Sequence, residues 1–178
     1  MSTLDPRDPL VFDIAELGRR AGSMLEVHRT VPAPAELGGG VAVVPAGSDL
    51  GLDLRFESVV EGVLVSGTAA VTVTGECAGC LDPISWDETV GVTELFLYEP
   101  GPQDEELPLL AGDLLDLRQV VRDAVVLALP LAPLCSSDCP GLCVECGARL
   151  ADDPTHSHDT IDARWAALTE LNLTDKDG

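Results

Sequence analysis

Two neighbouring stretches of the chain alternate between apolar and polar residues. The first begins at Leu50, and the second covers residues 63–76, where Ser and Thr fill much of the polar face. A period of two puts alternate side chains on opposite faces of a β-strand, so each stretch predicts a strand with one buried face. The short connection "VEG" between them predicts an antiparallel hairpin. The residues on the two apolar faces are Leu50, Leu52, Leu54, Phe56, Val63, Val65, Ala69, Val71 and Val73.

Further strands and one main helix are expected elsewhere. Residues 23–31 and 89–98 have the composition of strands. In the stretch 113–129 the apolar residues recur at intervals of three and four, which is typical of an amphipathic helix. Asp113 is the expected N-cap of this helix. The sequence therefore predicts an α+β fold, with an antiparallel β-sheet or a partly open β-barrel as its core.

The chain is expected to divide near residue 133. Residues 1–133 would form a β-rich core domain that ends in the helix 113–129. Residues 134–178 would form a Cys/His-rich module with a C-terminal amphipathic helix packed on the core. The apolar face of that helix would carry Ile161, Trp165, Leu168 and Leu171.

The N-terminal sequence and the apolar runs bear on localisation. "MSTLDPRDPLVFD" lacks the apolar region of a signal peptide, and no run approaches the roughly 20 apolar residues of a membrane span. We therefore expect a cytoplasmic protein without a membrane partner. Cysteines stay reduced in that compartment, and clustered cysteines there bind metal more often than they form disulfides.

The charge balance is strongly acidic, with 31 acidic residues against 10 basic ones and a net charge of −21. Such a field repels phosphate backbones, so DNA is excluded as a partner and direct binding to naked RNA is disfavoured. It favours a basic protein partner, although the alternative is a surface that only keeps the protein soluble. Three consecutive acids, Asp104, Glu105 and Glu106, lie in an expected exposed loop and are candidate partner-binding residues.

Four cysteines within twelve residues form the main candidate site. Cys135, Cys139, Cys143 and Cys146 are followed by two histidines, His156 and His158. Gly147 permits the positive φ that a Cys-x-x-Cys turn tends to need, and Cys or His ligands at this spacing are typical of structural zinc. We expect one structural Zn²⁺, bound mainly by Cys143 and Cys146 with partners from the other four residues. The alternatives are unmetallated thiols and a redox disulfide.

Cys77 and Cys80 form a second possible thiol pair, in "GECAGCLDP". Four interpretations are open from the sequence. The pair could be half of a second metal site, could join Cys143 and Cys146 in one ribbon, could be a redox pair, or could be two semi-buried thiols.

Three segments together resemble the YceD-like family, the bacterial large ribosomal RNA subunit accumulation proteins. They are "ECAGCLDP", "LPLAPLCSSDCPGLCVECGARL" and "TIDARWAALTEL", and the resemblance is strong from about Gly75 onward. Gly79 stands where the family usually has Arg, and Val144 stands where it usually has Pro. Many relatives carry Cys-x-Cys at the place of His156 and His158, an exchange that keeps metal-ligand chemistry.

The resemblance implies a role in 23S rRNA accumulation and large-subunit assembly. It implies a large-subunit ribosomal protein or a pre-50S particle as the partner, and an acidic protein without catalytic activity suits a basic ribosomal component. The alternative is an enzyme, either a thiol-redox protein or a metal-dependent nuclease that processes rRNA. The sequence contains no G-x-S-x-G, P-loop or H-E-x-x-H motif, so we favour a non-catalytic binding protein.

Overall fold

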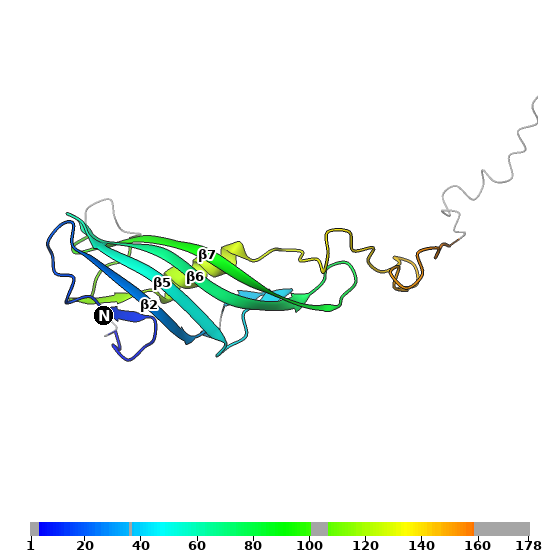
Figure 1. The fold of residues 1–178 in the computed structure, drawn as a ribbon, viewed down its shortest axis with the longest axis horizontal. Coiled ribbons are helices and arrows are strands. Elements are labelled where there is room, and N and C mark those ends of the chain that lie inside the picture. The colour runs from blue at the N-terminus through cyan, green and yellow to red at the C-terminus, as the bar shows by residue number, and fades with distance from the viewer. Residues whose placement is uncertain (1–3, 36, 101–106, 159–178) are drawn as a thin grey trace, which may run out of the picture.

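A long antiparallel sheet forms the body of the molecule (Figure 1). The structure, a computed structural model, describes residues 4–35, 37–100 and 107–158. The long strands are β2 (Met24–Pro32), β5 (Asp49–Ser58), β6 (Gly62–Glu76) and β7 (Pro83–Leu97), and the short strands β3 (Gly38–Gly39) and β4 (Ala42–Val43) extend the sheet. The order is β2-β5-β6-β4-β3. β7 pairs with β6 along its other edge, since the same β6 residues pair with both β5 and β7.

The alternating stretches form the expected hairpin. β5 and β6 pair antiparallel, from Leu50 opposite Val71 to Ser58 opposite Val63. All nine apolar residues predicted for the inner faces are buried. Gly67 lies in the middle of β6 with φ of +155°, where a Cβ would overlap the carbonyl oxygen of Asp53. A side chain at this position would force the two strands apart, so glycine is required here.

β7 begins earlier than the sequence predicts. The strand expected at 89–98 starts at Pro83, because it pairs with β6 without interruption from Gly62 opposite Leu97 to Glu76 opposite Pro83. The connection between these two strands is therefore only residues 77–82. Cys77 and Cys80 lie at the tip of a long hairpin.

The main helix, α1 (Arg118–Ala128), is shorter than predicted. Asp113 is not its N-cap, because Leu117 occupies that position. Leu114–Asp116 instead forms strand β8 and pairs with β1 (Val11–Asp13) in a two-stranded sheet. Leu115 is fully buried by this pairing, so a contact with the N-terminal segment overrides the local helical pattern.

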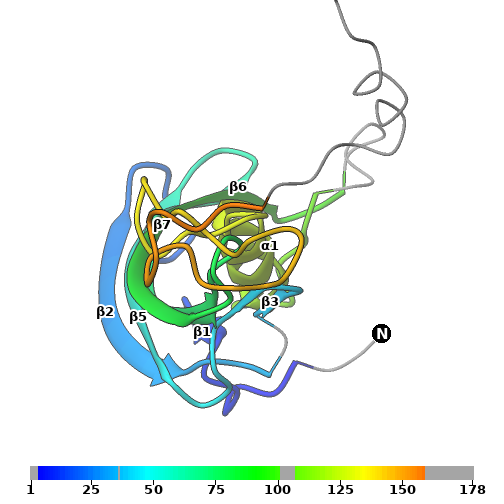
Figure 2. The same cartoon turned by 90° about the vertical axis from the view of Figure 1, so that its right-hand side faces the viewer.

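The core lies between the sheet and α1. Seen end-on, the sheet curves around the helix (Figure 2). Leu117, Val121 and Val125 are fully buried and belong to the same cluster as the inner faces of β5 and β6. Each such side chain contributes about 1.5–3 kcal/mol when it leaves water.

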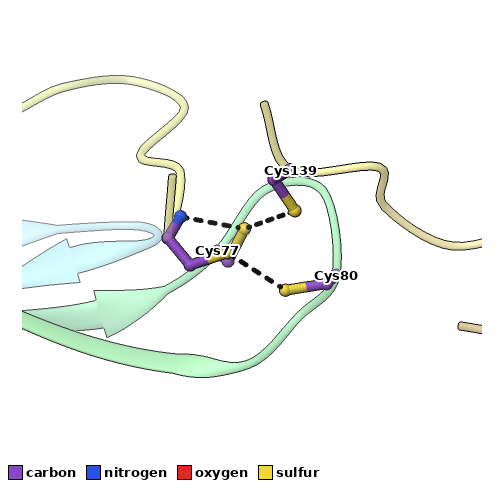
Figure 3. A group of neighbouring side chains, drawn as sticks. Cys77, Cys80 and Cys139 are labelled. Atoms are coloured by element: carbon purple, nitrogen blue, oxygen red, sulfur yellow. Dashed lines mark hydrogen bonds between the residues drawn. The ribbon is translucent and has the colours of Figure 1, made fainter. Parts of the chain in front are cut away.

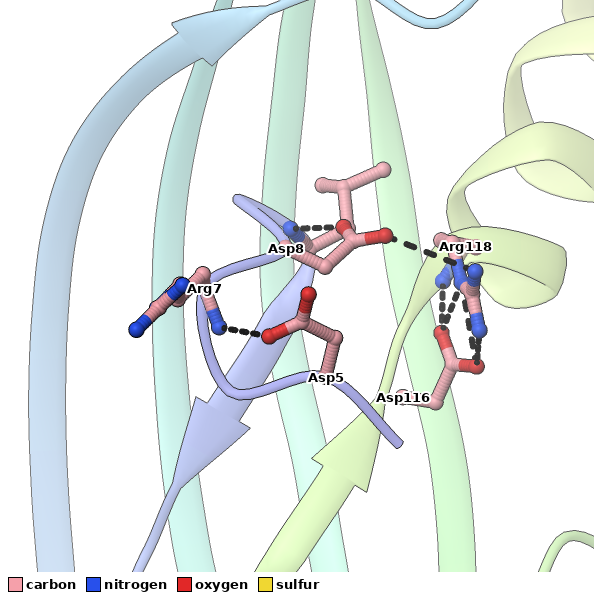
Figure 4. Close-up of polar contacts among 6 residues, drawn as sticks. Asp5, Arg7, Asp8, Asp116 and Arg118 are labelled. Carbon is pink, nitrogen blue, oxygen red and sulfur yellow. Dashed lines mark hydrogen bonds and ion pairs between the residues drawn. The ribbon is translucent and has the colours of Figure 1, made fainter. Parts of the chain in front are cut away.

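An ion-pair network connects the N-terminal segment to the start of α1. Arg118 lies between Asp116 and Asp8, with Arg118 Nη1 3.4 Å from an Asp8 carboxylate oxygen (Figure 4). Asp116 also accepts a hydrogen bond from the backbone N–H of Arg118 at 3.0 Å. That N–H has no partner within the helix, so Asp116 stabilises the helix start.

The structure confirms the α+β fold and shows the form that the sheet takes. The core is an open antiparallel sheet with one helix among the described residues, and not a closed barrel. Within the ranges described, no helix combines the length and hydropathy needed to cross a membrane. Two predicted elements lie outside the described residues: the acidic loop at Asp104, Glu105 and Glu106, and the helix expected from Ile161 onward.

Candidate metal centres

The tip of the β6–β7 hairpin folds into a tight loop around the sulfur of Cys77. The N–H of Leu81 donates to the carbonyl oxygen of Cys77 at 2.9 Å, and the N–H of Cys77 donates to that of Asp82 at 2.8 Å. Backbone N–H groups of Cys80, Cys135 and Gly79 point at the Cys77 sulfur and lower its pKa to about 6. This loop therefore favours a thiolate at Cys77, which is the form that binds metal.

The loop at Cys143–Cys146 has the same backbone hydrogen bonds. The N–H of Gly147 donates to the carbonyl oxygen of Cys143 at 2.8 Å, and the N–H of Cys143 donates to that of Ala148 at 2.8 Å. The backbone N–H groups of Cys146 and Glu145 lower the pKa of Cys143 to about 6. The predicted positive φ of Gly147 is confirmed at +73°.

Four cysteine sulfurs gather at the hairpin tip. We call Cys77, Cys80, Cys135 and Cys139 the tetrathiol group; their sulfurs all lie within 4.8 Å of one another. The Cys77 and Cys139 sulfurs are 3.7 Å apart, as are those of Cys80 and Cys135. Figure 3 shows the side chains of Cys77, Cys80 and Cys139 turned toward one another. In a zinc tetrahedron with bonds of about 2.3 Å, neighbouring sulfurs lie about 3.8 Å apart.

The segment after α1 carries Cys135 and Cys139 to the hairpin tip. The N–H of Ala78 donates to the carbonyl oxygen of Pro133 at 2.7 Å, which sets this segment beside the tip. The N–H of Cys135 then donates to the sulfur of Cys77 at 3.3 Å. Beyond Cys139, the N–H of Leu142 donates to the carbonyl oxygen of Gly79 at 3.1 Å. Backbone hydrogen bonds before Cys135 and after Cys139 therefore hold this cysteine pair beside Cys77 and Cys80.

The second group, which we call the Cys/His group, consists of Cys143, Cys146, His156 and His158. The Nε2 atoms of both histidines lie 3.2 Å from the Cys146 sulfur, and 2.8 Å from each other. These separations are a few tenths of an ångström shorter than the edges of a zinc tetrahedron, about 3.3–3.6 Å for the bond lengths of these ligands. Nδ1 of His158 lies 3.6 Å from a carboxylate oxygen of Glu145, the kind of partner that orients a metal-binding histidine.

A turn at Asp153 places His156 and His158 beside Cys143 and Cys146. The Asp153 carboxylate accepts hydrogen bonds from the N–H and the hydroxyl of Thr155, at 3.0 Å and 2.7 Å. The N–H of His156 donates to the carbonyl oxygen of Asp153 at 3.1 Å. The hydrogen bonds to Thr155 lower the pKa of Asp153, so its carboxylate stays charged and keeps the turn closed.

The structure divides the predicted ligands between these two groups. Cys143 and Cys146 lie with His156 and His158, whereas Cys135 and Cys139 lie with Cys77 and Cys80. Cys77 and Cys80 therefore do not join Cys143 and Cys146 in one ribbon. All six cysteines are free thiols, and each group could hold a metal ion with four protein ligands.

Comparison with known proteins places the chain in a family. Residues 65–172 match the family described as Large ribosomal RNA subunit accumulation protein YceD. Uncharacterized proteins of Mycobacterium tuberculosis and Mycobacterium bovis are each 48% identical over 168 residues, which cover 92% of this chain and 81% of each relative. An uncharacterized protein of Mycobacterium leprae is 41% identical over 172 residues, 94% of this chain and 79% of the relative. No solved structure matches the chain. The matched region contains β7, α1 and both cysteine groups, and the chain belongs to the YceD family.

Proposed function

We propose that this protein is a cytoplasmic assembly factor for the large ribosomal subunit, a binding protein without catalytic activity. It would support 23S rRNA accumulation by binding a basic large-subunit ribosomal protein, alone or within a pre-50S particle. The observation that carries the proposal is membership of a family named for accumulation of the large ribosomal RNA subunit. The choice of a basic protein as the partner rests on the net charge, and the choice of a non-catalytic role rests on the two cysteine groups.

The ligand groups favour a structural role for the metal. Each offers four protein ligands, and a four-coordinate zinc held by all of them has no open position for water or substrate. A nuclease would need such an open position and a general base. For this reason we favour a binding protein over a metal-dependent rRNA-processing enzyme. A thiol-redox enzyme is the second alternative, with Cys77 and Cys143 as its low-pKa thiols.

We assign zinc to Cys143, Cys146, His156 and His158. Thiolate and imidazole are ligands that zinc prefers, and the group supplies all four ligands of a tetrahedral site. The surrounding segment has little core of its own, since Val144 is fully exposed and Cys146 is exposed as well. Structural zinc contributes roughly 10–16 kcal/mol of apparent binding free energy in small modules of this kind. A segment with so few buried side chains would depend on that contribution.

The charge selects the class of partner. A net charge of −21 attracts a basic protein and repels naked rRNA, so contact with the pre-50S particle would go through protein. Attraction of this kind weakens as the Debye length falls from about 10 Å at 0.1 M salt to about 3 Å at 1 M.

The test is a binding assay together with a depletion experiment. Purified protein is measured against individual basic large-subunit proteins and against 23S rRNA fragments across a salt series, and 23S rRNA is compared with 16S rRNA in cells that lack the protein. We expect salt-sensitive binding to a ribosomal protein, weak binding to free rRNA, and a selective loss of 23S rRNA. Tight binding to free rRNA with none to any ribosomal protein, or unchanged 23S rRNA on depletion, would contradict the proposal.

A further inference from the structure

We propose that the tetrathiol group is a second zinc centre, separate from the Cys/His group, which fastens the segment after α1 to the tip of the β6–β7 hairpin. The protein would then hold two zinc ions per chain. Cys77 and Cys80, for which the sequence left four interpretations open, would supply two of the four ligands. The second centre does not depend on the identity of any ribosomal partner.

The positions of the four sulfurs fit a metal site. Both sulfur–sulfur separations of 3.7 Å match the edge of a zinc–thiolate tetrahedron, about 3.8 Å. A disulfide needs its sulfurs about 2.05 Å apart, and none of the six cysteines is in one. Four sulfurs from two segments more than fifty residues apart in sequence therefore converge with the separations of a metal site rather than of a cross-link.

The backbone of the hairpin tip matches that of the loop at Cys143–Cys146. The loop at Cys77 repeats both hydrogen bonds of the loop at Cys143, with the same donors and acceptors relative to the first cysteine. In each loop the residue after the second cysteine has positive φ, +62° at Leu81 and +73° at Gly147. This conformation is strained for a non-glycine residue, so Leu81 keeps it only because its surroundings hold it there. The two loops thus have the same backbone conformation, although the first has Leu81 where the second has Gly147.

Four thiolates in this group would need a cation to balance their charge. Cys77 is buried and Cys80 and Cys139 are half-buried, so four thiolates here would place several negative charges close together in a partly dry space. A divalent cation at the centre is the species that lets all four ionise, because coordination deprotonates a thiol.

The donor set selects the metal. Four soft thiolates in a tetrahedron favour zinc over magnesium, calcium or manganese, which prefer oxygen ligands. Iron also accepts four thiolates, and it is therefore an outcome that the experiment must distinguish.

The position of the group gives its role. Contacts on both sides already run from the hairpin tip to the segment after α1: Ala78 with Pro133, Gly79 with Leu142, and an ion pair between Asp82 and Arg149. Single hydrogen bonds of this kind each add little net stability, and an exposed ion pair adds less. A metal bound to two residues on each side would be the strongest link between the sheet and the Cys-rich segment (Figure 1).

The experiment counts metals on the full-length protein. The protein is purified under reducing conditions without chelator, and native mass spectrometry and elemental analysis give the zinc content of the wild type. Two variants form a matched pair, Cys135→Ser/Cys139→Ser for the tetrathiol group and Cys143→Ser/Cys146→Ser for the Cys/His group. We expect two zinc ions in the wild type and one in each variant.

Hydrogen exchange shows which region each variant loosens. Loss of the tetrathiol centre should increase exchange at 77–82 and 133–142, and loss of the other centre should increase it at 143–158. Circular dichroism confirms that the sheet remains folded. Cobalt substitution of the wild type gives a readout that needs no variant, because the tetrathiol group supplies four thiolates and the Cys/His group supplies two. If both centres are occupied, the intensity of the thiolate-to-cobalt charge-transfer absorption should correspond to six bound thiolates.

Three results would overturn the inference. They are one zinc per chain in the reduced wild type, two zinc ions retained by the Cys135→Ser/Cys139→Ser variant, and iron as the metal lost from that variant. None of these measurements involves a ribosomal partner. A failure to bind ribosomal proteins would therefore count against the proposed function and leave the zinc count unaffected.

Discussion

Leu81 and Gly147 occupy the same place in two loops that are far apart in the sequence. Each follows the second cysteine of a Cys-x-x-Cys, each has positive φ, and each donates its N–H to the carbonyl oxygen of the first cysteine. The two loops differ in that only one has the residue that adopts this conformation without strain. Leu81 is also well exposed, at 60% of its surface, so its side chain contributes little packing.

This difference predicts opposite effects of exchanging the two residues. Gly147→Leu should weaken metal retention at the Cys/His group about tenfold, since a positive φ costs a non-glycine residue about 1–2 kcal/mol. Leu81→Gly should leave the tetrathiol group unchanged or stabilise it by up to about 1 kcal/mol, because the relieved strain is partly offset by glycine's greater entropy in the unfolded chain. Competition with a chelator measures both effects. Leu81→Ala is the control, and if it stabilises as much as Leu81→Gly, the backbone explanation is wrong.

Gly141 should tolerate substitution worse than Gly112, another glycine with positive φ. Its φ is +75°, and a Cβ there would lie 3.1 Å from the carbonyl oxygen of Gly79 at the hairpin tip. Gly141→Ala should therefore add a close contact to the backbone strain and speed the reaction of Cys139 with a thiol reagent. Gly112→Ala is a matched control, because Gly112 has φ of +69° and a Cβ there would meet no atom within 4 Å. The control should cost about 1–2 kcal/mol of strain without changing thiol reactivity, and equal reactivity in both variants would count against the contact.

Removal of metal should affect one region of the molecule. With a chelator present, amide hydrogens at the hairpin tip, 77–82, and in 134–158 should exchange faster, because the tip loses its metal and few buried side chains hold the later segment. Amides in β5 and in β6 up to Gly75 should keep their protection, since the core of these strands and α1 is complete without the segment. Mass spectrometry of peptides from holo and chelated protein measures this. Uniform loss of protection across the sheet would show that the core depends on the metal.

The sheet can be predicted from the sequence because its signal is local. Alternation in residues 50–73 reports which face is buried, and the structure confirms both the strands and their pairing. The predicted start of helix α1 is wrong, because the apolar spacing of Leu114 and Leu117 fits a helix while Leu115 is needed to pair with Phe12 in β1. A partner about a hundred residues away leaves no trace in the local pattern.

The division of the ligands is inaccessible from the sequence for a similar reason. Cys135 and Cys139 are close in sequence to Cys143, but hydrogen bonds from Ala78 to Pro133 and from Leu142 to Gly79 hold their segment at the hairpin tip. One signal is present in the sequence: Cys77-x-x-Cys80 and Cys143-x-x-Cys146 have equal spacing. Leu81 in place of a glycine makes the first loop look unlike the second, and only the structure reveals that the backbones agree.

Asp116 should make the stability of the protein depend on pH in the acid range. Hydrogen bonds from the Arg118 side chain lower the pKa of Asp116 below its ordinary value. The stabilisation that the Asp116 carboxylate gives to the folded protein is therefore complete above its pKa in the unfolded chain, about 3.9. It is lost as the pH falls through the lower pKa that Asp116 has in the folded protein. Because the pair is partly exposed, we expect Asp116→Asn to cost only about 1 kcal/mol near neutral pH.

Denaturant unfolding at several pH values tests this contribution. The free energy difference between wild type and Asp116→Asn should be constant at neutral pH and should shrink below about pH 4. Asp123→Asn is the control, since its carboxylate accepts hydrogen bonds from the neutral amide of Gln119 on the exposed side of α1. A difference that stays constant down to about pH 2 would show that the charge of Asp116 does not contribute.

The three acids that the sequence predicts in an exposed loop should act on the rate at which the partner associates. Asp104, Glu105 and Glu106 are three consecutive carboxylates in a chain of net charge −21, and we propose that they help to attract a basic ribosomal protein. Charges at the edge of an interface act mainly on the rate of association. The variant Asp104→Asn/Glu105→Gln/Glu106→Gln should therefore slow association at low salt and leave dissociation nearly unchanged. The difference from wild type should fade as salt shortens the Debye length toward about 3 Å at 1 M. Binding kinetics across a salt series measure both rates, and Glu26→Gln/Asp53→Asn/Glu57→Gln, which removes three acids from β2 and β5, is a control of equal charge. If both variants slow association equally, the total charge matters and the loop has no special role; if only dissociation changes, the acids make direct contacts instead of steering the partner.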